Sequence, residues 1–173
     1  MDFWILFVLR ASLMAIPLYV CNGLALVFGG GPRVDLGKNF FDGRPILGAG
    51  KTFRGTAGGI FFGFLASLLL GISFPETSEV IGAPYLYYGA LLSLGAVAGD
   101  FAGSFAKRRL GIPRGESVLF LDQLDFVVGG LAFGLLLAGP SALEAIFLLA
   151  FTMLAHVLGN YAAFFSKIKK VPW

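Results

Sequence analysis

Residues 55–74 read GTAGGIFFGFLASLLLGISF, a run of twenty residues without a charged side chain. A helix needs about 20 mainly apolar residues to cross the hydrocarbon layer of a membrane, which is about 30 Å thick. Unpaired backbone groups are too costly in lipid, and the sequence lacks the alternation of β-barrel strands. We therefore expect a transmembrane helix here.

The composition of the whole chain also indicates a membrane protein. Of its 173 residues, 57% are hydrophobic and 13% are charged, and the mean hydropathy is +0.84. A typical soluble domain is about 25% charged, so this chain has too few charges to cover a water-soluble globule. The 19 phenylalanines exclude a disordered chain, because disordered segments are poor in aromatic residues.

Four further segments are long and apolar enough to be spans: about residues 3–28, 84–106, 121–138 and 141–165. The sequence therefore predicts an all-α integral membrane protein with five transmembrane helices in a single domain, residues 1–173. The first segment begins with an acidic and two aromatic residues, whereas a cleaved signal peptide begins with basic residues. We expect this segment to be a true span.

The basic residues gather on one side of this arrangement. All 13 lysines and arginines except Arg10 lie in the loops 29–54 and 107–120 or in the tail 167–170. Positively charged loops stay in the cytoplasm. We predict a multi-pass protein of the cell membrane with its N-terminus outside, its C-terminus cytoplasmic and its active site on the two cytoplasmic loops. Arg10 falls in the outer half of its span, where we expect it to reach the interface or pair with Asp2.

Glycines recur at a spacing of four residues in three of the predicted spans. They are Gly55, Gly59 and Gly63, then Gly95, Gly99 and Gly103, then Gly130 and Gly134. Such stripes let membrane helices approach closely, so we interpret them as packing surfaces, which would also permit a homodimer.

Three aspartates, Asp100, Asp122 and Asp125, lie in or beside apolar helices. A charge at membrane depth costs at least a few kcal/mol and usually faces a polar cavity. Together the three carboxylates suit a Mg²⁺ ion, which prefers oxygen ligands. Structural alternatives remain open: a cap and an ion pair for Asp122 and Asp125, and an interhelical hydrogen bond for Asp100.

Basic and hydroxyl side chains flank these aspartates. Lys107, Arg108 and Arg109 follow Asp100, and the stretch GKTFRG (50–55) ends the first loop. The second stretch supplies Lys51, Thr52, Arg54 and Gly55 at the start of a helix, where backbone N–H groups bind anions. Basic loops also serve only to orient membrane helices, and that alternative covers the C-terminal lysines. Carboxylates beside phosphate-binding cations suit phosphoryl or nucleotidyl transfer to a lipid.

Other sites are excluded by what the sequence lacks. The stretch PILGAGKT (45–52) is not a P-loop, because Pro45 replaces the required glycine and no strand precedes it. With Cys21 as the one cysteine and His156 as the one histidine, there is no disulfide, no cysteine-based zinc site and no separate histidine base. We expect His156 and Asn160 to make interhelical hydrogen bonds.

Two segments carry a family resemblance. Residues 100–109, DFAGSFAKRR, and residues 121–125, LDQLD, resemble the signature of the CDP-diacylglycerol synthases, which has a Ser-x-x-Lys-Arg core and ends in Asp-Arg-x-Asp. Gln123 stands in place of the arginine between the two aspartates. Together with the short chain and the GKT-x-RG stretch, this departure resembles the archaeal branch, the CDP-archaeol synthases. The resemblance covers about residues 22–130.

The resemblance implies a reaction. CTP and an unsaturated archaeal ether lipid, 2,3-bis-O-geranylgeranylglycerol 1-phosphate, would give the CDP-lipid and pyrophosphate with Mg²⁺. The metal would be held by Asp100, Asp122 and Asp125, with Lys107 as a fourth catalytic residue. The implied substrate-binding residues are Asn22, Lys51, Thr52, Arg54, Gly55, Ser104, Arg108 and Arg109. The partners would be CTP, a lipid phosphate and the membrane, with no nucleic acid.

Two alternatives belong to other classes. A small ion-coupled transporter or lipid-flipping module would use a buried Asp100, but such proteins often contain internal inverted repeats, and we find none. A membrane subunit without catalysis would have no need for three aspartates and several cations on one face.

Overall fold

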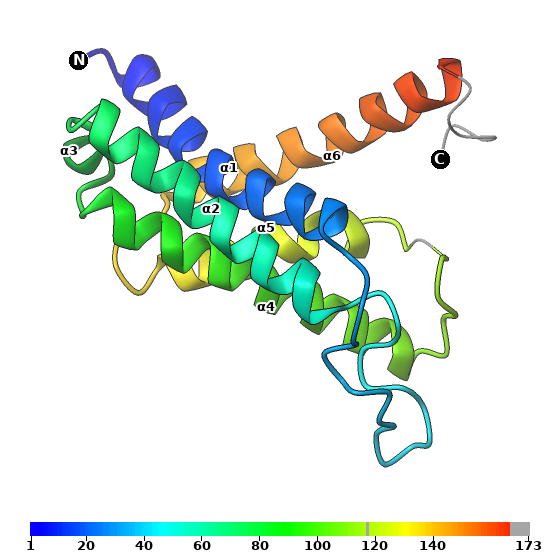
Figure 1. Cartoon of the computed structure of the whole chain (residues 1–173). Coiled ribbons are helices and arrows are strands. Elements are labelled where there is room, and N and C mark those ends of the chain that lie inside the picture. Colours follow the sequence, from blue (N-terminus) through cyan, green and yellow to red (C-terminus); the bar gives the residue numbers. More distant parts are fainter. Residues whose placement is uncertain (117, 167–173) are drawn as a thin grey trace.

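The structure, a computed structural model, describes residues 1–116 and 118–166, and these residues form six helices (Figure 1). The long helices are α1 (Phe3–Val27), α2 (Phe53–Ser73), α4 (Tyr85–Arg109) and α6 (Ala142–Phe165), and the shorter ones are α3 (Thr77–Ile81) and α5 (Leu121–Gly134). Apart from two isolated bridges in the loop between α1 and α2, the described residues contain no β-structure. The predicted all-α fold is confirmed. The predicted basic tail, Lys167, Lys169 and Lys170, lies outside the described residues.

Helices α1, α2, α4 and α5 run alongside one another, whereas α6 diverges from this bundle toward its C-terminal end (Figure 1). Within the described residues, four helices are long and apolar enough to cross a membrane: Phe3–Val27, Phe53–Ser73, Tyr85–Arg109 and Ala142–Ala162, the last within α6. The first of these contains Pro17 without a break in the helix.

The predicted fourth span, about residues 121–138, differs from expectation. Its helix, α5, ends at Gly134 and has 14 residues, so it is about 21 Å long at 1.5 Å per residue. The chain continues in turns toward Pro140, which has no N–H with which to extend a helix. It nevertheless passes from one end of the bundle to the other, because Asp122 pairs with Lys107 near the end of α4 and Gly139 accepts a hydrogen bond from Arg10 of α1.

The glycine stripes are packing surfaces, as predicted. On α4, a Cβ at Gly95 would lie 2.4 Å from the Gly129 carbonyl oxygen, and one at Gly99 would lie 2.0 Å from the Asp125 carbonyl oxygen. On α2, a Cβ at Gly59 would lie 2.7 Å from the Cys21 carbonyl oxygen of α1. No real Cβ tolerates these distances, so the backbones of the paired helices touch at the glycines.

Arg10 has a different partner from the one predicted. Its Nε lies 2.6 Å from Glu144 Oε1, and its Nη1 donates hydrogen bonds to the carbonyl oxygens of Val80 and Ile81. Asp2 instead caps α1, accepting a hydrogen bond from the Trp4 N–H at 2.9 Å. Glu144 is almost fully buried, and a buried carboxylate requires a cation. The pair ties α6 to α1 and α3.

The loop between α1 and α2 is organised around a buried carboxylate that the sequence analysis missed. Asp35 accepts hydrogen bonds from the backbone N–H groups of Gly37, Leu47 and Gly48 at 2.8 to 3.0 Å. Burial alone would raise the pKa of Asp35, but these three hydrogen bonds and the nearby Arg33 charge hold it below its usual value. The bonds close the loop just before Lys51, so they position the segment that enters α2.

We expect the substitution Gly99→Ala to destabilise the protein by about 1–3 kcal/mol, because the new methyl group overpacks the α4–α5 contact. Thermal unfolding in detergent would measure the loss. Gly159→Ala in α6 is the matched control, since nothing lies within 4 Å of its Cβ position. Equal melting temperatures for the two variants would contradict the close packing of α4 and α5.

We expect Asp35→Asn to loosen residues 33–50, because an amide nitrogen cannot accept the backbone hydrogen bonds and an unpaired buried donor costs about 1–3 kcal/mol. Hydrogen–deuterium exchange would show faster exchange there, and Lys38→Gln, an exposed change in the same loop, would not. Because the pKa of Asp35 is lowered in the folded state, its stabilisation is complete above the ordinary pKa of about 3.9 and is lost as the pH falls through the lowered value. Equal protection of the wild type and Asp35→Asn at pH 7 would refute this role.

Candidate functional site

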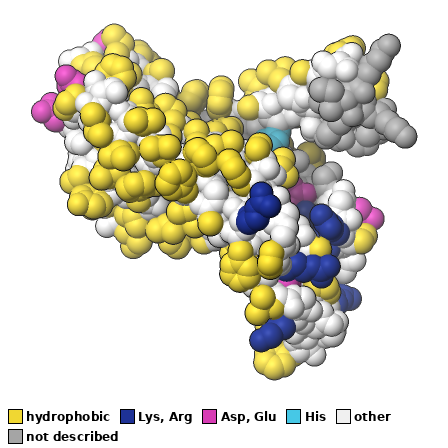
Figure 2. All heavy atoms as spheres, viewed as in Figure 1, with side chains coloured by type: hydrophobic (Ala, Val, Ile, Leu, Met, Phe, Trp, Pro, Cys, Tyr) yellow, Lys and Arg dark blue, Asp and Glu magenta, His cyan; other side chains and the backbone are white. Residues whose placement is uncertain are grey.

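Most of the basic side chains lie at one end of the molecule. Figure 2 shows hydrophobic side chains over the helices, whereas Lys and Arg gather around the loop between α1 and α2 and the end of α4. Many of the apolar side chains are exposed, including Phe61 at 56% and Ile72 at 70%. This distribution fits helices surrounded by lipid with one polar end in water.

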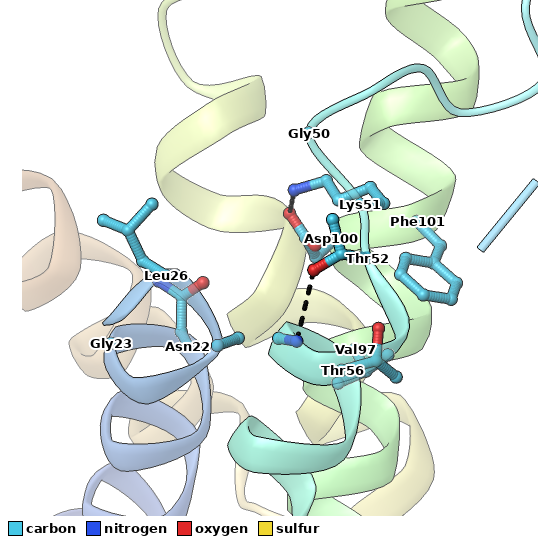
Figure 3. Close-up of a pocket in the computed structure, with 12 residues that line it drawn as sticks. Asn22, Gly23, Leu26, Gly50, Lys51, Thr52, Thr56, Val97, Asp100 and Phe101 are labelled. Carbon is cyan, nitrogen blue, oxygen red and sulfur yellow. Dashed lines mark hydrogen bonds and ion pairs between the residues drawn. The ribbon is translucent and has the colours of Figure 1, made fainter. Parts of the chain in front are cut away.

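A pocket of about 180 Å³ opens at this polar end between α1, α2 and α4 (Figure 3). Its polar lining brings together four of the predicted site residues: Asn22 from α1, Lys51 and Thr52 from the loop and the cap of α2, and Asp100 from α4. Gly55, also predicted, lines it as well. These residues are far apart in the sequence, so the pocket depends on the packing of the three helices.

An ion pair between Lys51 Nζ and Asp100 Oδ1 lies in the pocket (Figure 3). Each side chain keeps about a quarter of its surface exposed, so a polar ligand can reach both. Thr52 is buried and caps α2, accepting a hydrogen bond from the Gly55 N–H at 3.2 Å. The N-terminal end of α2 therefore points at the pocket with its partial positive charge, which favours an anion there.

The other two predicted aspartates lie on α5, outside the lining of this pocket. Asp122 Oδ1 is 2.5 Å from Lys107 Nζ, and Asp122 Oδ2 accepts a hydrogen bond from the Val118 N–H. Asp125 packs against Gly103, where a Cβ would lie 2.3 Å from its Oδ2. Asp100, Lys51 and Asp122 all act electrostatically on Asp125. Three of the four residues predicted to be catalytic are thus acidic, and they lie on or against the C-terminal half of α4.

These aspartates do not form a ready three-ligand metal site. Within residues 1–116 and 118–166, no group of three or more His, Cys, Asp or Glu side chains is placed to hold a metal ion. Asp100 and Asp122 are each neutralised by a lysine instead. The donor set still fits a Mg²⁺ ion that arrives with a nucleotide, because this ion is usually bound by one or two carboxylates together with substrate phosphates.

Four further residues predicted for the site lie outside the lining of the Lys51–Asp100 pocket. Arg109 Nη1 lies 2.8 Å from Asp42 Oδ1, and its guanidinium stacks at 4.8 Å on the rings of Phe40 and Phe105. Arg109 therefore holds the α1–α2 loop against α4 in this structure. Arg54 is exposed and outside the pocket lining, Ser104 is buried in α4, and Arg108 lines a second pocket described below.

Asp35, which the sequence reasoning missed, could in part have been found from the sequence next to it. In the stretch Asp35-Leu36-Gly37, the side chain accepts a hydrogen bond from the backbone N–H two residues later, which is the pattern of an Asx turn. The hydrogen bonds that Asp35 accepts from Leu47 and Gly48 correspond to no local sequence pattern, because these residues lie 12 and 13 positions further along the chain. His156 and Asn160 lie on α6, and their predicted interhelical hydrogen bonds stay a prediction.

Comparisons with known proteins identify the family of this chain. Residues 4–173 match the protein-family model described as CarS-like, CDP-archaeol synthase. The CDP-archaeol synthase of Methanocaldococcus jannaschii is 46% identical over 95% of this chain and 97% of its own length, and that of Pyrococcus abyssi is 41% identical over 91% and 94%. A solved structure of an intramembrane enzyme for archaeal membrane lipid biosynthesis superposes with a TM-score of 0.78 at 36% identity, covering 87% of this chain and 92% of that one. This multi-pass membrane protein therefore belongs to the CDP-archaeol synthase family.

Proposed function

We propose that this chain transfers CMP from CTP to the phosphate of 2,3-bis-O-geranylgeranylglycerol 1-phosphate, giving CDP-archaeol and pyrophosphate. Family membership supports the reaction type. The geometric observation that carries the proposal is that a polar pocket and an apolar groove lie next to each other along the same two helices. That arrangement suits a substrate with a charged head and hydrocarbon chains.

The apolar groove has a volume of about 430 Å³ between α2 and α4. On α2, Thr56 lines the polar pocket and Ala57 and Ile60 line the groove. On α4, Val97 lines the polar pocket and Leu94 lines the groove. The two cavities are therefore neighbours, and an isoprenoid chain in the groove would place its phosphate beside Lys51 and Asp100.

The chemistry requires no protein base. A phosphate monoester has a second pKa near ~6, so the lipid phosphate is largely dianionic at neutral pH. One of its oxygens attacks the α-phosphorus of CTP, a new P–O bond forms, and the bond to the β-phosphate oxygen breaks with its electron pair leaving on pyrophosphate. Lys51 would neutralise the phosphate oxygens once its ion pair with Asp100 is replaced by a contact with the substrate. The side-chain amide of Asn22 would form hydrogen bonds with the nucleoside.

Asp100 and Asp125, with Asp122 beside them, would hold a Mg²⁺ ion that arrives with CTP. The bound ion would supply charge neutralisation at the phosphoryl group. Lys107 holds Asp122 at the start of α5. The homodimer that the glycine stripes would permit stays a prediction. The transporter alternative is less favoured, because the described lysines other than Lys38 lie with Asp100 and Asp122 at one end of the bundle, where they form the two Lys–Asp ion pairs.

The membrane orientation follows the charge distribution. We propose five crossings in a single domain, with α5 and the turns after it forming the short fourth crossing. The loop between α1 and α2 and the connection between α4 and α5 face the cytoplasm, and α3 faces outward. CTP then reaches the site from the cytoplasm.

The function predicts that purified protein with labelled CTP, Mg²⁺ and the lipid phosphate forms a labelled lipid, and that EDTA abolishes the product until Mg²⁺ is restored.

Lys51→Met is expected to lower kcat/KM by about ten- to a hundredfold, since it removes a charge-assisted contact of ~1.5–3 kcal/mol. Lys38→Met, an equal charge change at an exposed position outside the predicted site, is expected to cost less than about fivefold. Absence of a labelled lipid with the wild type would overturn the function. Equal losses in the two variants would remove Lys51 from the site.

The topology predicts the labelling of single cysteines in intact cells. Phe41→Cys, at a fully exposed position of the α1–α2 loop, is expected to resist a membrane-impermeant maleimide and to react after permeabilisation. Glu79→Cys, at an exposed position of α3, is expected to react in intact cells. The native Cys21 is fully buried and contributes little background. Labelling of position 41 from outside would reverse the orientation and separate the site from CTP.

A further inference from the structure

A second pocket at the polar end of the bundle is lined by four arginines and by no acidic residue. It measures about 430 Å³ between the α1–α2 loop and the connection after α4. The arginines are Arg33 and Arg44 from the loop, Arg108 from α4 and Arg114 from the connection. Like charges in one pocket repel each other, so an anion bound among them would stabilise this arrangement.

The arginines have free donors. Among the described residues, Arg33, Arg108 and Arg114 take part in no ion pair, because the four pairs present use Arg10, Lys51, Lys107 and Arg109. The Nε atom of Arg108 is buried without a hydrogen-bond acceptor. Arg44 is different, because its Nη1 donates to the carbonyl oxygens of Arg108 and Arg109. Arg44 thus fixes the pocket wall, and the other three arginines have unused donors.

One turn of backbone separates this pocket from the pocket of Lys51 and Asp100. The Lys51 N–H donates to the Gly48 carbonyl oxygen at 3.3 Å, closing the turn 48–51. Gly48 and Ala49 line the arginine pocket, whereas Gly50 and Lys51 line the other. If the α-phosphorus of CTP lies at Lys51, the β- and γ-phosphates lie near this turn.

We propose that the arginine pocket binds the pyrophosphate released from CTP. The inference rests on the proposed function, which supplies this leaving group. Pyrophosphate carries several negative charges and two sets of oxygens, and planar guanidinium groups bind such oxygens in pairs. When the bond between the α-phosphorus and the bridging oxygen breaks, pyrophosphate keeps the electron pair and moves across the turn. Its departure clears Lys51 and Asp100 for the CDP-lipid.

The test is direct binding of pyrophosphate alone to detergent-purified protein, measured by calorimetry without CTP or lipid. Arg33→Gln and Arg114→Gln are each expected to weaken binding by about three- to tenfold, as for partly exposed charge-assisted contacts, and the double variant by more. Lys38→Gln is the control, because it removes an exposed cation of the same loop outside the pocket. Inorganic phosphate is expected to bind the wild type more weakly than pyrophosphate.

Formation of the CDP-lipid is measured in parallel with each variant. Pyrophosphate binding that is unchanged in the double variant, or equally weakened by Lys38→Gln, overturns the arginine pocket even if the wild type makes the lipid product. A wild type that binds pyrophosphate but makes no CDP-lipid overturns the proposed function instead. The substituted side chains are exposed, and an unchanged gel-filtration profile checks that each variant is folded.

Discussion

The contact between the backbones of α4 and α5 is the constraint on which the rest of the site depends. In lipid, helices gain no hydrophobic energy from meeting, so association relies on close packing. Gly95, Gly99 and Gly103 remove every side chain from one face of α4, and α5 lies directly on that face. The space left by Gly103 is filled by the carboxylate of Asp125. A larger residue there would displace the carboxylate from Asp100, so the glycine stripe sets both packing and charge placement.

Two lysine–aspartate ion pairs lower the electrostatic cost of bringing Asp100, Asp122 and Asp125 close together. Lys51 reaches Asp100 from the α1–α2 loop, and Lys107 reaches Asp122 from α4. Each pair neutralises a carboxylate that would otherwise be costly near apolar surroundings. Because the side chains of Lys51 and Asp100 are partly exposed, their net strength is modest, and a phosphate can compete for the lysine. The Lys51–Asp100 contact thus joins the α1–α2 loop to α4, and in the proposed reaction Lys51 would exchange it for a contact with the substrate phosphate.

The sequence predicted those parts of the fold that follow from local pattern. Twenty apolar residues predict a membrane helix wherever they occur, and glycines four apart lie on one helix face. The sequence did not predict which side chains pair with each other when they are far apart in the chain. Arg10 pairs with Glu144, which is 134 residues away, rather than with nearby Asp2. Arg109 binds Asp42 in a loop without regular structure. The short α5 was also missed, because composition alone does not show where turns replace a helix.

Helix α4 orders the three cavities along one face. Ala90 and Leu94 line the apolar groove, Val97 and Phe101 line the polar pocket, and Arg108 lines the arginine pocket. These positions are three, four or seven residues apart, which keeps them on one side of a helix. At 1.5 Å per residue, Leu94 and Asp100 are about 9 Å apart along the axis, and Asp100 and Arg108 about 12 Å. Polarity therefore rises along the helix from apolar side chains to an ion pair to a cation, which is the order that we propose for the lipid chain, the reacting phosphate and the leaving group. In the reaction we propose, this one helix would hold all three parts in register. Among the described residues that line the three cavities, none belongs to α6, which diverges from the bundle.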